Sequence, residues 1–125
     1  MNEQEFKDRT KKLALRIIAL TESLPNTTAA KVIGRQILRS GTSVGANYRA
    51  ACRAKSTADL INKLSIVEEE ADESLYWLEL LIEAEIIKEA KLTQLINDMN
   101  EVVSMTVSSI KTLRSKEIQN PKSKI

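Results

Sequence analysis

The residues best suited to do chemistry in this sequence are five cations at helical spacing: Lys31, Arg35, Arg39, Arg49 and Arg53. On one continuous helix at about 100° per residue, all five fall within about 40° of a common direction. A rigid row of cations on one face is suited to the phosphate backbone of RNA or DNA. The alternative is that these side chains pair with acidic residues of the next segment, in the same chain or a neighbouring one.

Charge is unevenly distributed along the chain, although the net charge is only +2. Residues 28–63 contain seven bases and one acid, whereas residues 64–90 contain nine acids and one base. Such opposed segments can bind each other within a protomer or between protomers. Aromatic residues make up only 3% of the chain. We therefore expect any contact with nucleic acid to be mainly electrostatic, with little stacking on bases.

The stretch SGTSVGAN, residues 40–47, contains two of the three glycines and is the one candidate for a phosphate-binding loop. Such a loop needs a lysine after the second glycine and a strand before the first, and this sequence has neither. Apolar residues keep their helical phase through the stretch, as do the cations on either side of it. We therefore predict that the stretch belongs to one helix over about residues 31–53.

Glycine is unfavourable inside a helix, so its use in this segment needs a reason. Gly34, Gly41 and Gly45 share one flank of the predicted helix, and a flank without side chains lets a second helix approach closely. We predict close helix packing at these three residues. The alternative is a kink at Ser40 and Gly41.

No set of residues in the sequence favours catalysis or metal binding. The chain has no histidine, so the Glu-x-x-His pairs of di-iron bundles are missing, and the single cysteine, Cys52, has no histidine to activate it. On a helix the acidic residues 68–73 point in several directions. We expect Glu73 to be solvated and Glu70 to pair with an arginine or to cap a hydroxyl. The prediction is a non-enzymatic protein with no catalytic residues, metal or cofactor.

The elements that must position these residues are helices, because Ala, Leu, Ile, Glu, Lys and Arg dominate while glycine and proline are scarce. Apolar spacing predicts four of them: residues 3–24, 31–53, 57–87 and 92–114. Asn2 with Glu5, and Ser56 with Asp59, are start signals for the first and third. Regular four–three spacing predicts an all-α, antiparallel up-down-up-down four-helix bundle.

We expect a single domain over residues 1–115 and a frayed polar tail over residues 116–125. The chain has no apolar run of about 20 residues, and its charged N-terminal segment lacks the apolar centre of a signal peptide. A cytoplasmic protein that does not bind membranes is therefore expected, which a single cysteine also suits.

The third predicted helix has apolar residues on two faces. One face is the predicted core, and the other is the predicted oligomer interface: Ile66, Trp77, Leu80, Leu81, Ala84 and Ile87. A helix of a monomeric bundle buries one stripe, so the second stripe predicts contact with other copies of the chain, anchored by Trp77. The alternative is a fold in which this helix is central and buries both stripes.

The segment RSGTSVGANYRAACRAKSTADLINKLSIVEEEADESLYWLELL, residues 39–81, resembles a family of small bacterial four-helix-bundle proteins. These are the 23S rRNA intervening-sequence proteins, and the resemblance extends over about residues 6–113. Its most specific parts are the SV and AN pairs at residues 43–47, Ser56, the KL pair at residues 63–64, and the EEADES run at residues 69–74 with YWL at residues 76–78. The glycine-containing turn that the family often has after its third helix is missing from residues 85–89, which leaves the end of that helix uncertain.

The resemblance implies a ring-like homo-oligomer, typically a homopentamer. The family is similar in fold to the accessory protein of diversity-generating retroelements, a pentameric barrel that binds nucleic acid and a reverse transcriptase. No catalytic residues carry over. We therefore expect an oligomeric bundle that binds RNA or DNA through its basic helix face. The alternative is a scaffold whose ring docks a protein partner.

Overall fold

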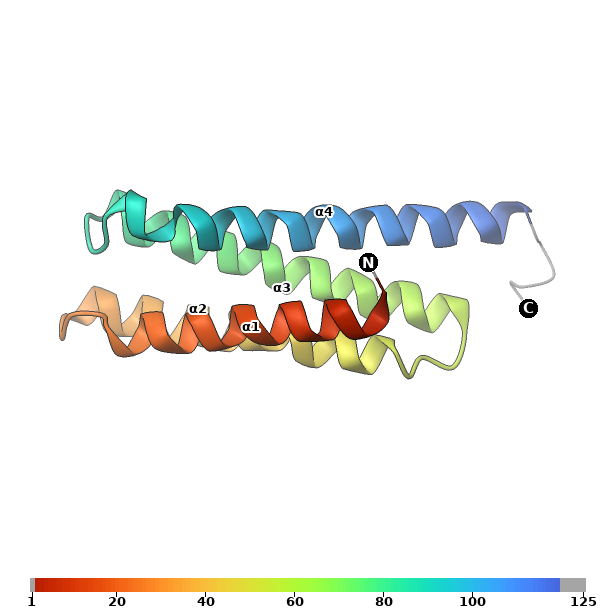
Figure 1. Ribbon diagram of the computed structural model, residues 1–125, viewed down its shortest axis with the longest axis horizontal. Coiled ribbons are helices and arrows are strands. Elements are labelled where there is room, and N and C mark those ends of the chain that lie inside the picture. Colours follow the sequence, from red (N-terminus) through yellow and green to blue (C-terminus); the bar gives the residue numbers. More distant parts are fainter. Residues whose placement is uncertain (1, 120–125) are drawn as a thin grey trace.

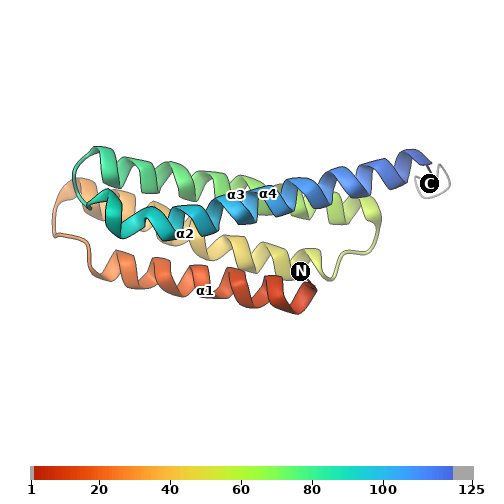
Figure 2. The same cartoon turned by 45° about the horizontal axis from the view of Figure 1, so that its top comes forward.

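Four helices make up the part of the chain that the computed structural model describes, residues 2–119 (Figure 1). They are α1 (Glu3–Glu22), α2 (Thr28–Ala51), α3 (Thr57–Glu83) and α4 (Glu89–Gln119). No strand occurs within residues 2–119, so the predicted all-α class with four helices is confirmed. Short connections lie at alternating ends of an elongated bundle, and the chain reverses direction at each of them (Figures 1 and 2).

Two of the helix starts use the capping residues that the sequence indicates. The Asn2 side chain accepts a hydrogen bond from the Glu5 N–H at 2.8 Å, and the Ser56 hydroxyl accepts one from the Asp59 N–H at 3.0 Å. Each cap satisfies a backbone donor that has no partner within its helix. Both predicted start signals are confirmed.

The stretch SGTSVGAN lies inside α2, as its apolar phase predicts. No glycine of the described chain has a positive φ angle. The helix differs from the prediction at its ends: it begins at Thr28, after the capping residue Thr27, and it ends at Ala51. Arg53 therefore lies in the connection to α3 rather than on the helix.

Glycines let α1 and α2 approach closely. A Cβ added to Gly41 would overlap the side chain of Ile17, and one added to Gly45 would lie 3.1 Å from Thr10 Oγ1. At Gly34 an added Cβ would lie 3.0 Å from a side chain in the segment that follows α1. Close packing of α2 against α1 and the segment that follows α1 thus offsets the helix propensity that the glycines lose. Ion pairs between Arg9 and Glu101, and between Arg16 and Asp98, link α1 to α4 on the outside.

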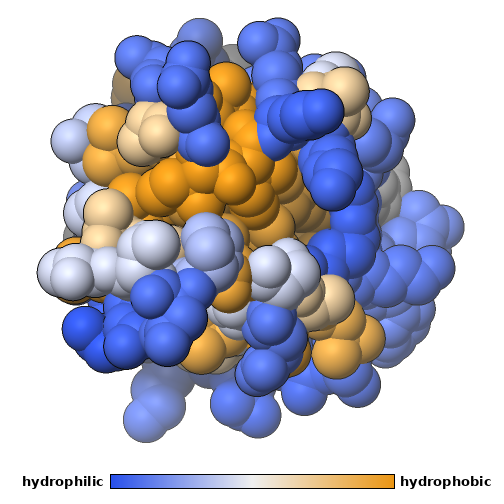
Figure 3. Space-filling view, turned by 90° about the vertical axis from the view of Figure 1, so that its left-hand side faces the viewer, coloured by the Kyte–Doolittle hydropathy of each residue, from blue (hydrophilic) through white to orange (hydrophobic). Residues whose placement is uncertain are grey.

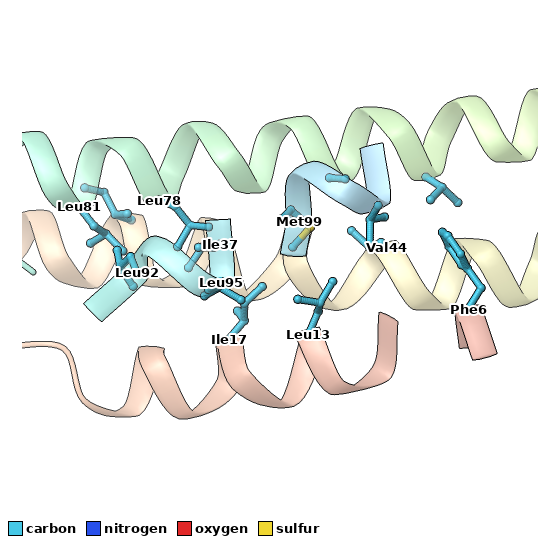
Figure 4. Close-up of a cluster of buried hydrophobic side chains, with 14 residues drawn as sticks. Phe6, Leu13, Ile17, Ile37, Val44, Leu78, Leu81, Leu92, Leu95 and Met99 are labelled. Atoms are coloured by element: carbon cyan, nitrogen blue, oxygen red, sulfur yellow. The ribbon is translucent and has the colours of Figure 1, made fainter. Parts of the chain in front are cut away.

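Side chains from all four helices meet in the main core along the bundle axis (Figure 4), and a smaller core cluster of Ala51, Leu64 and Ile110 lies near the α2–α3 connection. Two fully buried hydroxyls also lie in the interior, where Ser40 Oγ of α2 is 2.9 Å from Ser74 Oγ of α3. Either hydroxyl can donate in this bond, since Ser74 also lies 2.9 Å from the carbonyl of Glu70 and Ser40 lies 3.5 Å from that of Ile37. No buried side-chain N or O atom in residues 2–119 lacks a partner.

α3 packs against both α2 and α4, as each helix of this bundle packs against two others. Leu81, which the sequence assigned to the oligomer interface, is 0% exposed and belongs to the protomer core. That assignment is wrong, because a helix with neighbours on two sides buries more than one apolar stripe. The rest of the predicted interface remains partly at the surface: Ile66, Trp77, Leu80 and Ile87 are half-buried, and Ala84 is exposed.

α3 ends at Glu83, four residues before its predicted end, because the backbone turns at Glu85. Glu85 has a φ angle of 59°, in the left-handed region that favours glycine. The N–H groups of Ile86 and Ile87 both donate to the carbonyl of Leu81, at 3.0 and 3.1 Å. A glutamate therefore makes the helix-ending turn that glycine usually makes.

α4 is longer than predicted, and its last part projects past the other three helices (Figure 1). Residues 116–119, placed in a frayed tail by the sequence, continue the helix. Residues 120–125 of that predicted tail lie outside the described residues. None of the four helices is long and apolar enough to cross a bilayer.

Candidate nucleic-acid interface

The basic face of α2 is only partly as predicted. Lys31, Arg35 and Arg49 are exposed and form no ion pair with any residue in the described part of the chain. Arg53 is also exposed and unpaired, in the connection just past the helix. None of these four cations would have to break an ion pair with a described carboxylate in order to bind a ligand.

Arg39 is used differently, because its guanidinium lies between two carboxylates of α3. Its Nη1 is 3.3 Å from Glu70 Oε2, and its Nη2 contacts Glu73. The neighbouring Glu70 carboxylate, with that of Glu73, raises the pKa of Arg39. Trp77 Nε1 donates to Glu73 at 3.3 Å. For Arg39 the alternative interpretation is therefore correct: its side chain pairs with the acidic helix of the same chain.

This cluster confirms the expected pairing of Glu70 with an arginine and corrects the expectation for Glu73. Glu73 lies next to Arg39 and Trp77 rather than free in solvent, because α2 runs alongside this part of α3. Together with Ser40 and its partner Ser74, the ion pairs link α2 and α3 from outside and inside at one level.

More unpaired cations lie toward the C-terminal end of α4. Lys111, Arg114 and Lys116 are exposed and make no ion pair within residues 2–119. This part of α4 lies at the same end of the bundle as the end of α2 and the α2–α3 connection (Figure 1). Sequence reasoning missed them because it ended the helix near residue 114 and examined only cations that share one helix face.

A groove of about 680 Å³ opens between these two basic segments. Its walls come from the end of α2, the α2–α3 connection, the start of α3, and residues 108–113 of α4. Tyr48 and Cys52 lie in its lining, and burial raises the pKa of both the phenol and the thiol. Both groups are therefore neutral at pH 7, and the thiol is a weak nucleophile.

The opposite end of the bundle is apolar at its centre. Figure 3 shows hydrophobic side chains in a hollow framed by polar ones, between the α1–α2 and α3–α4 connections. The hollow has a volume of about 650 Å³, and Leu20, Ile86 and Ile87 are among its apolar lining residues. Lys88 and Lys91 line its edge. No set of three or more Cys, Asp or Glu side chains within residues 2–119 is arranged to hold a metal ion.

The comparisons with known proteins agree with this architecture. The sequence model of the 23S rRNA-intervening sequence protein family matches residues 2–108. The chain belongs to this family. A crystal structure of a protein of unknown function from the S23 ribosomal protein family of Bacteroides thetaiotaomicron VPI-5482 is similar, with 45% sequence identity and a TM-score of 0.82. The similarity covers 89% of this chain and 99% of that one. The search of curated proteins found no match.

The family that the sequence resembles is thus confirmed. The family match ends at residue 108, so most of the projecting, cation-bearing end of α4 lies beyond it.

Proposed function

We propose that this protein is a non-enzymatic, homo-oligomeric member of its family that binds RNA or DNA in the bacterial cytoplasm through the basic face of α2. The observation that carries the proposal is that Lys31, Arg35 and Arg49 are exposed and have no carboxylate partner among the described residues. When unpaired cations on a rigid helix neutralise phosphates, the counterions condensed on the nucleic acid are released, and this release drives binding. The family description refers to 23S rRNA, and this makes RNA the first ligand to test.

We propose further that the up-down-up-down protomers assemble into a ring, as a homopentamer. The support is an aromatic and aliphatic surface on α3 that the protomer leaves partly uncovered. Tyr76 is 53% exposed and makes an edge-to-face contact with the half-buried Trp77, with ring centroids 5.1 Å apart. Leu80 and Ala84 continue this surface toward the end of the helix. Large aromatic residues at a surface commonly anchor protein interfaces.

The nucleic-acid proposal is tested by fluorescence anisotropy with a labelled structured RNA at low and moderate salt. We expect affinity to fall steeply with salt. In a plot of the logarithm of the binding constant against the logarithm of the salt concentration, each neutralised phosphate contributes about −0.9 to the slope on duplex DNA and about −0.7 on single strands. The double variant Arg35→Glu, Arg49→Glu should lose binding. Lys12→Glu, a charge reversal on the exposed surface of α1, should bind nearly as well as the wild type. No binding by the wild type at low salt would exclude the proposal.

The assembly proposal is tested by light scattering of the wild type and of Tyr76→Glu. The wild-type mass should be five times the 14.0 kDa of one chain. The charged variant should have a lower mass at the same concentration while keeping its helical circular dichroism. A monomeric wild type would contradict the ring.

The second candidate function is a scaffold whose ring docks a protein partner. The observation that favours it is the apolar hollow in Figure 3, because an uncovered apolar surface with a polar rim is typical of a docking site. An intact oligomer that binds no RNA or DNA at low salt would favour this function over the first.

A further inference from the structure

The groove between the α2–α3 connection and α4 lies at the end of the bundle where α1 begins and α2 ends. The walls belong to α2, α3 and α4, and α1 contributes only its first residue, Glu3. Among the described residues, α1 therefore covers little of the groove. The floor is apolar and includes Leu60, Leu64 and Leu113. The volume of about 680 Å³ lies in the range of pockets that hold small ligands.

The rim of this groove has the side chains that commonly contact phosphates. Ser56, Ser109 and Thr112 are among its hydroxyl residues, and Lys55 is its basic residue. Lys116 lies one helical turn beyond Thr112, on the same side of α4. Hydroxyl and ammonium groups make many of the hydrogen bonds that proteins form with nucleic-acid backbones.

Acidic residues near the groove are few. None occurs in residues 46–58 or 102–116. Two nearby carboxylates are engaged, because Glu3 pairs with Lys7 at 3.5 Å and Asp59 pairs with Lys63 at 2.9 Å. Glu5 near the start of α1 and Glu117 near the end of α4 are further acids at this end of the bundle. The six unpaired cations of the two basic segments outnumber them: Arg49, Arg53, Lys55, Lys111, Arg114 and Lys116.

The interior of the groove distinguishes it from the basic face of α2. Tyr48 lies in the lining, and its ring packs on that of Phe6 with a centroid separation of 4.4 Å, which holds it in place. A recessed apolar floor with a fixed aromatic ring suits a base that has left its stack. A duplex presents only paired bases and a phosphate surface, so it cannot fill this floor.

We propose that this groove binds an unpaired nucleotide of a single-stranded nucleic acid. Its phosphates lie against Lys55, Lys116 and the rim hydroxyls, and its base lies on the apolar floor beside Tyr48. The inference rests on the proposed function, since it assigns the class of nucleic acid and a second site for it. The α2 face attracts any phosphate backbone, and the groove selects single strands.

The test compares one labelled RNA strand of mixed sequence with the same strand annealed to its complement, both by fluorescence anisotropy. The wild type should prefer the single strand. Lys55→Glu with Lys116→Glu should weaken single-strand binding about tenfold or more and remove the preference. Tyr48→Leu should weaken it at least about fivefold, as expected for loss of one stacked base. The control, Lys31→Glu with Arg35→Glu, alters the opposite end of α2 and should lower affinity for both forms equally.

A second measurement uses the wild-type protein, so that it does not depend on how any variant folds. Cys52 lines the groove. Saturating single-stranded RNA should slow alkylation of its thiol, and the duplex should not. Equal affinity for the two forms, or an alkylation rate that the single strand leaves unchanged, would overturn the inference.

The two proposals fail in different ways. If the wild type binds neither form at low salt, the proposed function fails. If binding is lost in the Lys31 and Arg35 variant but kept in the Lys55 and Lys116 variant, the groove is not a binding site, and the proposed function stands.

Discussion

A glutamate occupies a backbone position that favours glycine. The left-handed conformation of Glu85 costs a residue with a Cβ about 1–2 kcal/mol, and glycine adopts it freely. We expect Glu85→Gly to raise the free energy of unfolding by about 1 kcal/mol, because the greater freedom of glycine in the unfolded chain offsets part of the gain. Urea denaturation measures the change.

The control for this prediction is Glu83→Gly, two residues earlier at the end of α3. Glycine is unfavourable in a right-handed helical turn, so this variant should be less stable than the wild type. If both glycine variants lose stability, Glu85 is not strained.

A Cβ at Gly41 has no room, although alanine would improve helix propensity. The added atom would overlap Ile17, which is fully buried and cannot move aside easily. Overpacking of this kind costs about 1–3 kcal/mol, more than the roughly 1 kcal/mol that alanine gains in a helix. Gly41→Ala should therefore lower the free energy of unfolding, by up to about 2 kcal/mol.

A double-mutant cycle shows whether the contact is the cause. Ile17→Val removes the Cδ1 atom nearest to the added Cβ. The two substitutions together should cost less than the sum of their separate effects. Simple additivity would mean that Gly41→Ala acts elsewhere than at Ile17.

At the scale of one element, the start of α3 should make stability depend on pH. Hydrogen bonds from the Lys63 ammonium and the Lys55 N–H lower the pKa of Asp59, and burial opposes them slightly. A carboxyl whose pKa is lower in the folded state stabilises the fold above its unfolded pKa, which is about 3.9, and this is lost as the pH falls through the folded value. The free energy of unfolding should therefore fall below about pH 4, and less so in Asp59→Asn.

The matched control is Asp72→Asn, on the exposed side of the same helix, where the carboxylate makes no ion pair with a described residue. Its pH profile should stay close to that of the wild type. Equal profiles for all three proteins would contradict a role for Asp59 in the acid response. The measurement is chemical denaturation over a series of buffers.

The sequence predicted the helices well where local rules decide them. Capping at Asn2 and Ser56 and the helical phase through SGTSVGAN depend on neighbouring residues only, and all are present in the structure. The end of α3 was missed because Glu85 adopts a conformation that its residue type disfavours. Leu81 was misplaced because its burial depends on α3 having neighbours on two sides, which no local pattern reveals.

The candidate site was predictable in part for the same reason. Spacing alone placed Lys31, Arg35 and Arg49 on one exposed face. It could not tell them from Arg39, whose partners lie on another helix and become neighbours only through folding. The groove could not be predicted from the sequence, because it depends on how far α1 and α4 each extend along the bundle.

At the scale of the whole molecule, the projecting end of α4 should be dispensable for folding. Ile110 is 4% exposed and Leu113 is half-buried, and both pack with the smaller core cluster at this end. A chain that ends after Arg114 should unfold within about 0.5 kcal/mol of the wild type, because Ile110 and Leu113 keep their packing. A chain that ends after Ser109 should be less stable by about 2 kcal/mol or more, since it loses two packed side chains.

Thermal unfolding followed by circular dichroism gives both comparisons. A large loss of stability on removing residues 115–125 alone would show that the end of α4 contributes to the fold. An unchanged midpoint for the shorter chain would show that Ile110 is not part of a stabilising core.

The bonds that join Ser40 to Ser74 and Arg39 to Glu70 all act at one level of the α2–α3 pair. These polar contacts therefore fix the spacing of α2 and α3 near Ser40, about 16 Å along the helix from Ala51, which lines the groove. Side chains that lie outside the groove thus help to hold two of its walls at a fixed distance.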